Sequence, residues 1–171
     1  MINDDGEIIA QAPLPAKKPE IISGENLTVN AIIRLSQQGR WPVQQRQADF
    51  NQDALKGLQD FNRQAFFDAH EYFEEAWRSS PLEERELYRA LLQISGGFYR
   101  LTQGRPTAAH KFFDRALHWL QPFPSPFKTV DIDSLRAWLT ELLNALMEGH
   151  SSETILTQYF HPIDLPNQET L

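Results

Sequence analysis

The chain has 171 residues, a net charge of −7 at pH 7 and no cysteine. The missing cysteine excludes disulfides, thiolate catalysis and cysteine-ligated metals. The acidic balance, with lysine and arginine scattered along the sequence, argues against a nucleic-acid partner or an anionic membrane surface. The longest uncharged stretch of the central region, Ala90 to Tyr99, is too short to cross a bilayer. We therefore expect a cytoplasmic protein with one domain and no membrane insertion.

The N-terminal part differs in composition from the rest. Residues 1–28 contain three prolines, mixed charges and no aromatic residue, which predicts a flexible leader. Residues 29–49 are predicted to be weakly structured, with a short helix over Val29–Gln38 that Gly39 and Pro42 end. A helical bundle domain is predicted over residues 50–161 and a polar tail over residues 162–171.

Five helices are predicted in the bundle. The first begins at Phe50, where apolar residues recur at helical spacing, and the second runs from Ala65 to Ser79. Ser80, Pro81 and Glu83 form the pattern of a capping box, so a third helix is predicted from there to about Leu101, with Gly104 as its C-terminal cap.

The fourth and fifth helices have clear boundaries. Pro106 opens the fourth, which prolines at 122, 124 and 126 stop. Asp131 or Asp133 caps the fifth, and Gly149 closes it. No segment alternates like a strand, so the predicted fold class is all-α, an antiparallel bundle of about five helices with short connections.

One internal similarity has the length of a helical repeat. The stretches "AHEYFEEAW" (69–77) and "AHKFFDRAL" (109–117) align at an offset of 40 residues. Helical repeat proteins have periods of about 34 to 47 residues. Two copies do not define a repeat protein, and two amphipathic helices rich in aromatic residues can also match by chance.

The stretch "FFDAHEYFEEAWR" (66–78) places charges among aromatic residues. On a helical wheel His70 lies with Phe66, Phe73 and Trp77 on the apolar face, Glu74 flanks that face, and Glu71 lies at its boundary. An unpaired buried carboxylate costs several kcal/mol. Glu74 therefore needs a partner, and His70, one turn away, is the nearest candidate donor.

Three interpretations of this motif stay open. His70 and Glu74 can be a polar pair that joins the second helix to the third, where Gln93 and Arg100 offer further donors. They can instead be metal ligands, although the motif has Glu74 where H-E-x-x-H needs its second histidine. His70 can also act as a general base in a ligand pocket. His110 and Asp114 are the only similar arrangement elsewhere.

The stretches "FNRQAFFDAHEYFEEAWR" and "LLQISGGFYRLTQGRPTAAHKFFDRAL" together resemble the domain of unknown function 309 family, which has an H-E-x-x-E-x-x-W motif. The chain departs from the family pattern at Arg100, where a histidine is frequent, and at Arg105, where an asparagine is frequent. The resemblance implies an α-helical bundle and no established activity. It also favours a salt bridge from Arg100 to Glu71 or Glu74 over a metal site. The residues that carry the resemblance are His70, Glu71, Glu74, Trp77, Gln93, Tyr99, Gly104 and Ala109.

The functional hypothesis is a non-catalytic interaction or scaffold module with a protein partner. Its buried polar cluster is expected to hold the helices in register. The alternative is a small metal- or ligand-binding enzyme centred on His70, Glu71 and Glu74. No catalytic residue or cofactor is assigned; a divalent metal is the cofactor that the alternative would need. The expected cluster consists of His70, Glu71, Glu74, Trp77, Gln93, Tyr99 and Arg100.

Overall fold

The computed structural model describes residues 50–166. The predicted leader (1–28), the segment 29–49 with its short helix, and residues 167–171 of the predicted tail lie outside this range. The described residues contain five long helices, one short helix and one π-helical turn. They are α2 (Gln52–Asn62), α3 (Phe66–Ser79), α4 (Leu82–Thr102), α5 (Pro106–Leu120), α6 (Ile132–Met147), α7 (Ser152–Thr154) and η1 (Ile155–Tyr159).

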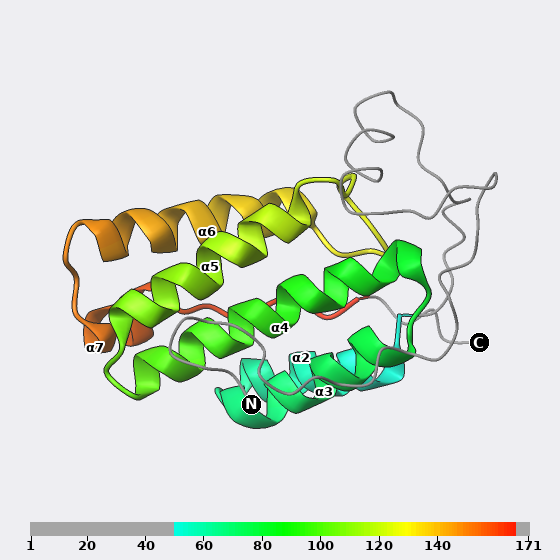
Figure 1. Ribbon diagram of the computed structural model, residues 1–171, viewed down its shortest axis with the longest axis horizontal. Coiled ribbons are helices and arrows are strands. Elements are labelled where there is room, and N and C mark those ends of the chain that lie inside the picture. The colour runs from blue at the N-terminus through cyan, green and yellow to red at the C-terminus, as the bar shows by residue number, and fades with distance from the viewer. Residues whose placement is uncertain (1–49, 167–171) are drawn as a thin grey trace.

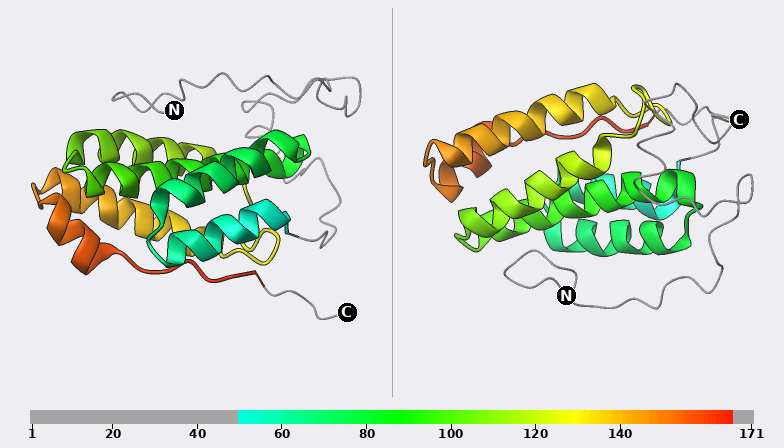
Figure 2. Two further views of the ribbon diagram at one scale, coloured as in Figure 1. Left: turned by 90° about the horizontal axis from the view of Figure 1, so that it is seen from below. Right: turned by 45° about the horizontal axis from the view of Figure 1, so that its top comes forward.

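The helices form two layers (Figures 1 and 2). In one layer α3, α4 and α5 lie side by side and antiparallel, with α4 in the centre. The second layer holds α2, which packs on α3, and α6, which packs on α5. No strand occurs in residues 50–166, where a single β-bridge joins Phe127 to Val130. The predicted all-α antiparallel bundle is therefore confirmed, and α7 and η1 are additions to the five predicted helices.

Aromatic side chains fill the space between the layers. Phe98, fully buried on α4, has its ring centroid 5.5 Å from that of Phe61 on α2, 5.2 Å from that of Phe113 on α5 and 5.5 Å from that of Trp138 on α6. Stacked and edge-to-face aromatic pairs add about 0.5–1.5 kcal/mol each beyond the burial of their area. The side of α4 that carries Phe98 thus faces the second layer.

The helix starts differ in part from those predicted. Asn51 caps α2, because its Oδ1 accepts from the backbone N–H groups of Asp53 (2.9 Å) and Ala54 (3.1 Å). The predicted capping box at Ser80 is wrong. Ser80 is extended and ends α3, its Oγ accepts from Asn51 Nδ2 (3.0 Å), and Pro81 precedes α4 without a side-chain cap. Ser80 therefore ties α3 to the start of α2.

The sequence similarity at an offset of 40 residues extends to the structure. A Cβ added to Gly57 would lie 2.7 Å from the ring of Phe73, and one added to Gly97 would lie 2.4 Å from the ring of Phe113. Both glycines therefore admit a phenylalanine from the next helix, and both glycine–phenylalanine pairs lie 16 positions apart. The hairpins α2–α3 and α4–α5 share this contact.

The turns of these hairpins also match. Gln64 (φ 64°) and Gly104 (φ 70°) occupy the left-handed conformation after α2 and α4. The next amide donates to a carbonyl five residues back in each turn, from Ala65 to Asp60 (2.9 Å) and from Arg105 to Arg100 (3.0 Å). After α6, Gly149 (φ 86°) is followed by the same bond, from the His150 amide to the Ala145 carbonyl (3.2 Å). The bundle is thus a series of three helical hairpins.

The C-terminal segment differs from the predicted polar tail. Ile163 is buried, and its backbone N–H and C=O both bond to the side chain of Asn62 at 2.8 Å. Pro166 is buried as well. Residues 162–166 therefore belong to the packed body, because a single apolar side chain in a polar segment can anchor it.

Candidate functional site

The side of the α3–α4–α5 layer opposite Phe98 is here called the outer face. No described element lies over it (Figure 2). A residue nine positions before Phe98 on a helix points about 180° away from it, so Arg89 lies on the outer face. By the same rotation Gln93 and Arg100 share that side of α4. The outer face is polar, in contrast to the aromatic core beneath it.

An arginine and two tryptophans bridge the three helices of the outer face. The Arg89 guanidinium lies 3.8 Å from the ring centroid of Trp119 on α5 and 5.4 Å from that of Trp77 on α3. Arg85, one turn earlier on α4, lies 5.2 Å from the Trp77 ring. Cation–π contacts of this kind contribute about 0.5–2 kcal/mol each. We call Trp77, Arg85, Arg89 and Trp119 the arginine–tryptophan cluster.

Glu86 and Arg115 lie next to the arginine–tryptophan cluster. Arg89 Nη1 is 3.6 Å from Glu86 Oε2, so the pair is electrostatic and too long for a good hydrogen bond. Burial raises the pKa of Glu86, and Arg89 and Arg85 partly offset that effect. Burial also lowers the pKa of Arg89, and Arg115 on α5 acts in the same direction. Positive charge therefore exceeds negative charge in this part of the outer face.

His70 on α3 is buried and has no hydrogen-bond partner in residues 50–166. Its side chain is 6% exposed, and neither Nδ1 nor Nε2 is paired. Burial lowers the pKa of His70 to about 4, and the nearby Arg100 guanidinium contributes to the same effect. His70 is therefore neutral at pH 7. Its ring stacks on that of Phe67 (6.2 Å), which in turn lies against Tyr99 (5.5 Å).

The predicted pairing of His70 with Glu74 is wrong. Glu74 is buried, as expected, but its Oε1 accepts from Arg78 Nη2 at 2.6 Å, one turn further along α3. A guanidinium outcompetes a neutral imidazole for a carboxylate, because the hydrogen bond is charge-assisted. Glu71 is exposed. The expected polar cluster therefore lacks the contact between His70 and Glu74.

The expected salt bridge of Arg100 is wrong as well. Neither Glu71 nor Glu74 forms an ion pair with it among the described residues, and its Nη1 instead donates to Gln103 Oε1 (2.8 Å). Arg100 and Gln93 are nevertheless buried, as the sequence predicts. The outer face therefore carries the predicted polar residues, but their contacts differ from those expected.

Several buried polar atoms of the outer face lack a hydrogen bond within the described part of the chain. Leaving a buried donor or acceptor unpaired costs about 1–3 kcal/mol, and native proteins contain few such groups. On α3 and α4 these atoms include His70 Nδ1 and Nε2, Trp77 Nε1, Arg78 Nε, Arg85 Nε, Glu86 Oε2, Arg89 Nε and Gln93 Oε1. Their concentration on one face distinguishes it from the rest of the molecule.

The described residues offer no converging metal ligands. Within residues 50–166 no group of three or more histidine, aspartate or glutamate side chains is placed to hold an ion. His110 is half-buried and Asp114 is exposed, so this second candidate pair lies at the edge of α5. The metal-site interpretation therefore finds no set of donor side chains in the described structure.

The contact among the arginines and Trp119 was not predicted from the sequence. Arg85 and Arg89 lie among acidic residues, Arg115 follows 26 positions after Arg89, and Trp119 lies on a helix whose other apolar residues are core. The spacing of Arg85, Arg89 and Gln93 by four residues was the available signal, because it places three polar side chains on one side of a helix. Only the antiparallel packing of α4 and α5 brings Trp119 to Arg89.

The comparisons with known proteins agree with the resemblance predicted from the sequence. Residues 54–112, from α2 into α5, match the model of the domain of unknown function family DUF309, which confirms the predicted resemblance. An uncharacterized protein of Aquifex aeolicus (strain VF5) is 29% identical over 94 residues, which cover 54% of this chain and 28% of that protein. This chain thus matches less than a third of that relative's length.

The remaining comparisons add two facts. No solved structure matches the chain. Among the described residues no helix is long and apolar enough to cross a membrane.

Proposed function

We propose that this chain is a non-catalytic interaction module that binds a protein segment across the outer face. One observation carries the proposal: buried hydrogen-bonding groups without partners in residues 50–166 gather on this face. A partner that supplies donors and acceptors there recovers the free energy that such groups cost when unpaired. The absence of cysteine agrees with a reducing compartment, so we place the module in the cytoplasm.

The extent of the unpaired groups favours a peptide over a small molecule. His70 and Trp77 are seven residues apart on α3, which corresponds to about 10 Å along the helix axis. The backbone of an extended peptide offers N–H and C=O groups at regular intervals over such a length. Trp77 and Trp119 add apolar area and arginine adds charge-assisted bonds, and these residue types dominate protein interfaces.

The alternative, an enzyme centred on His70, Glu71 and Glu74, is not favoured by the geometry. Arg78 binds the Glu74 carboxylate, and Glu71 is exposed. Elemental analysis of the untagged protein after incubation with zinc, manganese or iron tests this alternative. A stoichiometric metal in the wild type that a folded His70→Ala/Glu74→Ala variant lacks would overturn the proposal.

Selection of phage-displayed peptides on the intact protein tests the proposal directly. The selected peptides should bind Trp77→Phe and Arg89→Gln at least tenfold more weakly than wild type, because each substitution removes a donor from the outer face. Lys56→Gln changes an exposed residue of α2, in the other layer, and is the matched control. Equal affinity for all three variants, or selection of no peptide, would contradict the proposed function.

A further inference from the structure

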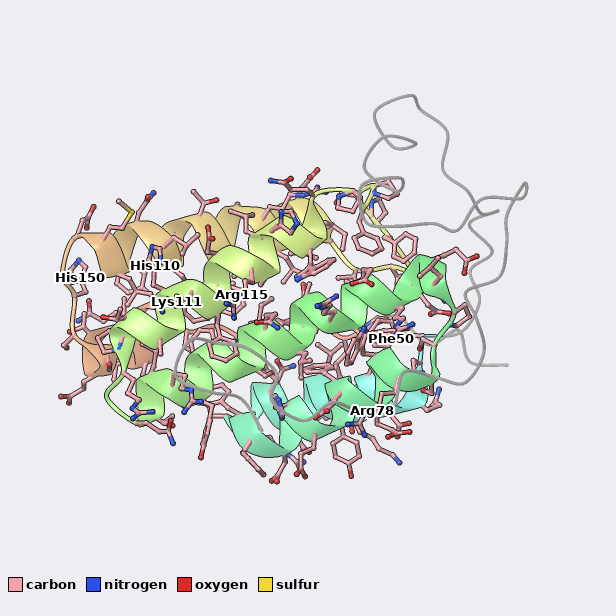
Figure 3. All side chains as sticks on the ribbon, in the orientation of Figure 1. Phe50, Arg78, His110, Lys111, Arg115 and His150 are labelled. Carbon is pink, nitrogen blue, oxygen red and sulfur yellow. The ribbon has the colours of Figure 1, made fainter. Side chains whose placement is uncertain are left out.

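The arginine–tryptophan cluster and the adjacent Arg115 carry more positive charge than the carboxylate beside them neutralises. Burial lowers the pKa of Arg89, and Arg85 and Arg115 act in the same direction, so three guanidinium groups lie close together where α4 packs between α3 and α5. Figure 3 shows Arg115 on α5 and Arg78 on α3, with α4 between the two helices. Glu86 is paired with Arg89, whereas Arg85 and Arg115 form no ion pair with a carboxylate of residues 50–166.

The acidic side chains nearby do not remove this excess charge. Glu74 accepts from Arg78 Nη2 at 2.6 Å, and Glu84 Oε2 lies 2.7 Å from Lys128 Nζ. Asp114 is exposed and forms no ion pair within the described part of the chain. A partly buried guanidinium that lacks an anion has lost hydration without gaining a charged partner. An incoming anion would therefore find an attractive site here.

The unpaired hydrogen-bonding groups of the cluster are mainly donors. Trp77 Nε1, Arg85 Nε and Arg89 Nε are buried and have no acceptor among residues 50–166. Glu86 Oε2 is an unpaired acceptor in the same region. Three donors and one acceptor call for a ligand that supplies acceptor oxygens, which agrees with the sign of the excess charge.

The arginines can accept such a ligand while they keep their contacts with the tryptophans. The Arg89 guanidinium lies 3.8 Å from the ring centroid of Trp119, so this contact uses the face of the guanidinium and leaves donors at its edge. The Nη atoms of Arg85 and Arg115 form no hydrogen bond and are not among the buried unpaired atoms of the described residues, so solvent reaches them. An acceptor can therefore approach these atoms directly.

A carboxylate suits this site better than a phosphate. Its two oxygens lie in one plane and can accept two parallel N–H bonds from one guanidinium. It also carries a single charge, and burying a second charge beside two indole rings would add to the cost of desolvation. In a protein segment this group is the side chain of a glutamate or an aspartate.

We propose that the segment bound across the outer face places a glutamate or aspartate side chain in the arginine–tryptophan cluster, with its carboxylate toward Arg85 and Arg115. The partner of this chain is thus an acidic protein segment. This inference rests on the proposed function, because it names the chemistry of the partner that the outer face binds.

Three phage libraries test the inference on the intact protein. Each displays short random peptides without aspartate or glutamate, and the central residue is fixed as glutamate, glutamine or lysine. Wild type should recover the glutamate library at least about tenfold more efficiently than the other two, because loss of one partner of an interfacial charge pair costs at least that much in affinity. Arg115→Gln should abolish this preference, and Arg85→Gln should do the same. Arg63→Gln, at an exposed position directly after α2 in the other layer, is the matched control and should keep it.

The fold of each variant is checked by circular dichroism, and Arg115→Gln removes no hydrogen bond or ion pair of the described structure. Equal recovery of the three libraries would overturn the inference. A preference for lysine would overturn it too, because Glu86 would then be the group that binds. If the recovered peptides nevertheless bind Trp77→Phe more weakly than wild type, the outer face binds peptides and only the carboxylate is wrong. Recovery of no peptide from any library would contradict the proposed function as well.

Discussion

At the residue scale, the position of His70 within its helical layer determines the protonation state of its side chain. A histidine beside two glutamates suggests an ion pair or a metal ligand when only the sequence is considered. In the folded chain the ring is buried and lies near the Arg100 guanidinium, and Arg78 donates to the Glu74 carboxylate. The imidazole is therefore kept neutral, and neither of its nitrogens has a hydrogen-bond partner in residues 50–166.

This environment predicts a dependence of stability on pH. His70 titrates near 6.5 in the unfolded chain and near 4 in the folded one, so between these values only the unfolded chain binds the proton. The free energy of unfolding should therefore fall as pH drops from 7 towards 4, by up to about 3 kcal/mol from this residue. Urea unfolding at pH 7 and pH 4.5 should show a smaller loss for His70→Gln than for wild type. Equal losses in the two proteins would refute the assignment.

Glu74 pairs with Arg78 and not with His70. This difference changes the loss in the free energy of unfolding that is expected when the Glu74 carboxylate is removed. A cation buried with Glu74 would be left uncompensated, at a cost of about 3–5 kcal/mol. The Arg78 side chain is instead 33% exposed and can be solvated by water. The cost of Glu74→Ala should consequently be smaller, in the range of a partly exposed ion pair.

At the element scale, the hairpin turns explain what sequence reasoning captured and what it missed. Proline and glycine act locally, so Pro106, Gly104 and Gly149 identified the helix boundaries correctly. Gln64 adopts the same left-handed conformation although it is not a glycine, and no sequence pattern near it predicted this turn. The contact of Arg89 with Trp119 depends on how α4 and α5 pack, and the partner of Glu74 depends on competition between two donors on α3. Helical spacing in the sequence specifies neither of these.

The matched turns give a reciprocal pair of substitutions. A residue with a Cβ in the left-handed conformation costs about 1–2 kcal/mol relative to glycine. Gln64→Gly should therefore stabilise the protein by about 1 kcal/mol, and Gly104→Gln should destabilise it by a similar amount. A Cβ at Gly104 meets no atom within 4 Å, so backbone conformation alone determines that effect. Thermal unfolding should show shifts of about 3 °C in opposite directions, and shifts of the same sign would contradict the equivalence of the turns.

At the scale of the whole molecule, the segment after η1 joins the third hairpin to the first. Asn62 donates to the carbonyl of Ile163 and accepts from its amide, and so substitutes for a backbone partner. The indole N–H of Trp138 likewise donates to the Tyr159 carbonyl at 2.8 Å. The segment from Tyr159 to Ile163 therefore connects α6 to α2, the two helices of the second layer.

Removing this connection should have a local and a global effect. Asn62→Ala leaves two backbone groups of Ile163 without partners, which predicts a loss of about 2 kcal/mol in the free energy of unfolding. Hydrogen exchange should accelerate most at residues 160–166. Asn144→Ala, at an exposed position on α6, is the matched control. A loss no larger than that of the control would show that the segment is held by Ile163 alone.

The pairing of Asn62 with Ile163 also bears on the order of events during synthesis. These residues are 101 positions apart, and joining the ends of a flexible loop of that size costs about 4 kcal/mol of chain entropy. The hairpins α2–α3 and α4–α5 contain only local contacts and can form while the chain is still emerging from the ribosome. Until Ile163 has been synthesised, the apolar surface of the first hairpin that Ile163 covers in the folded chain stays exposed to water. Nascent chains halted before Ile163 should accordingly recruit chaperones that recognise apolar surface, and complete chains should release them.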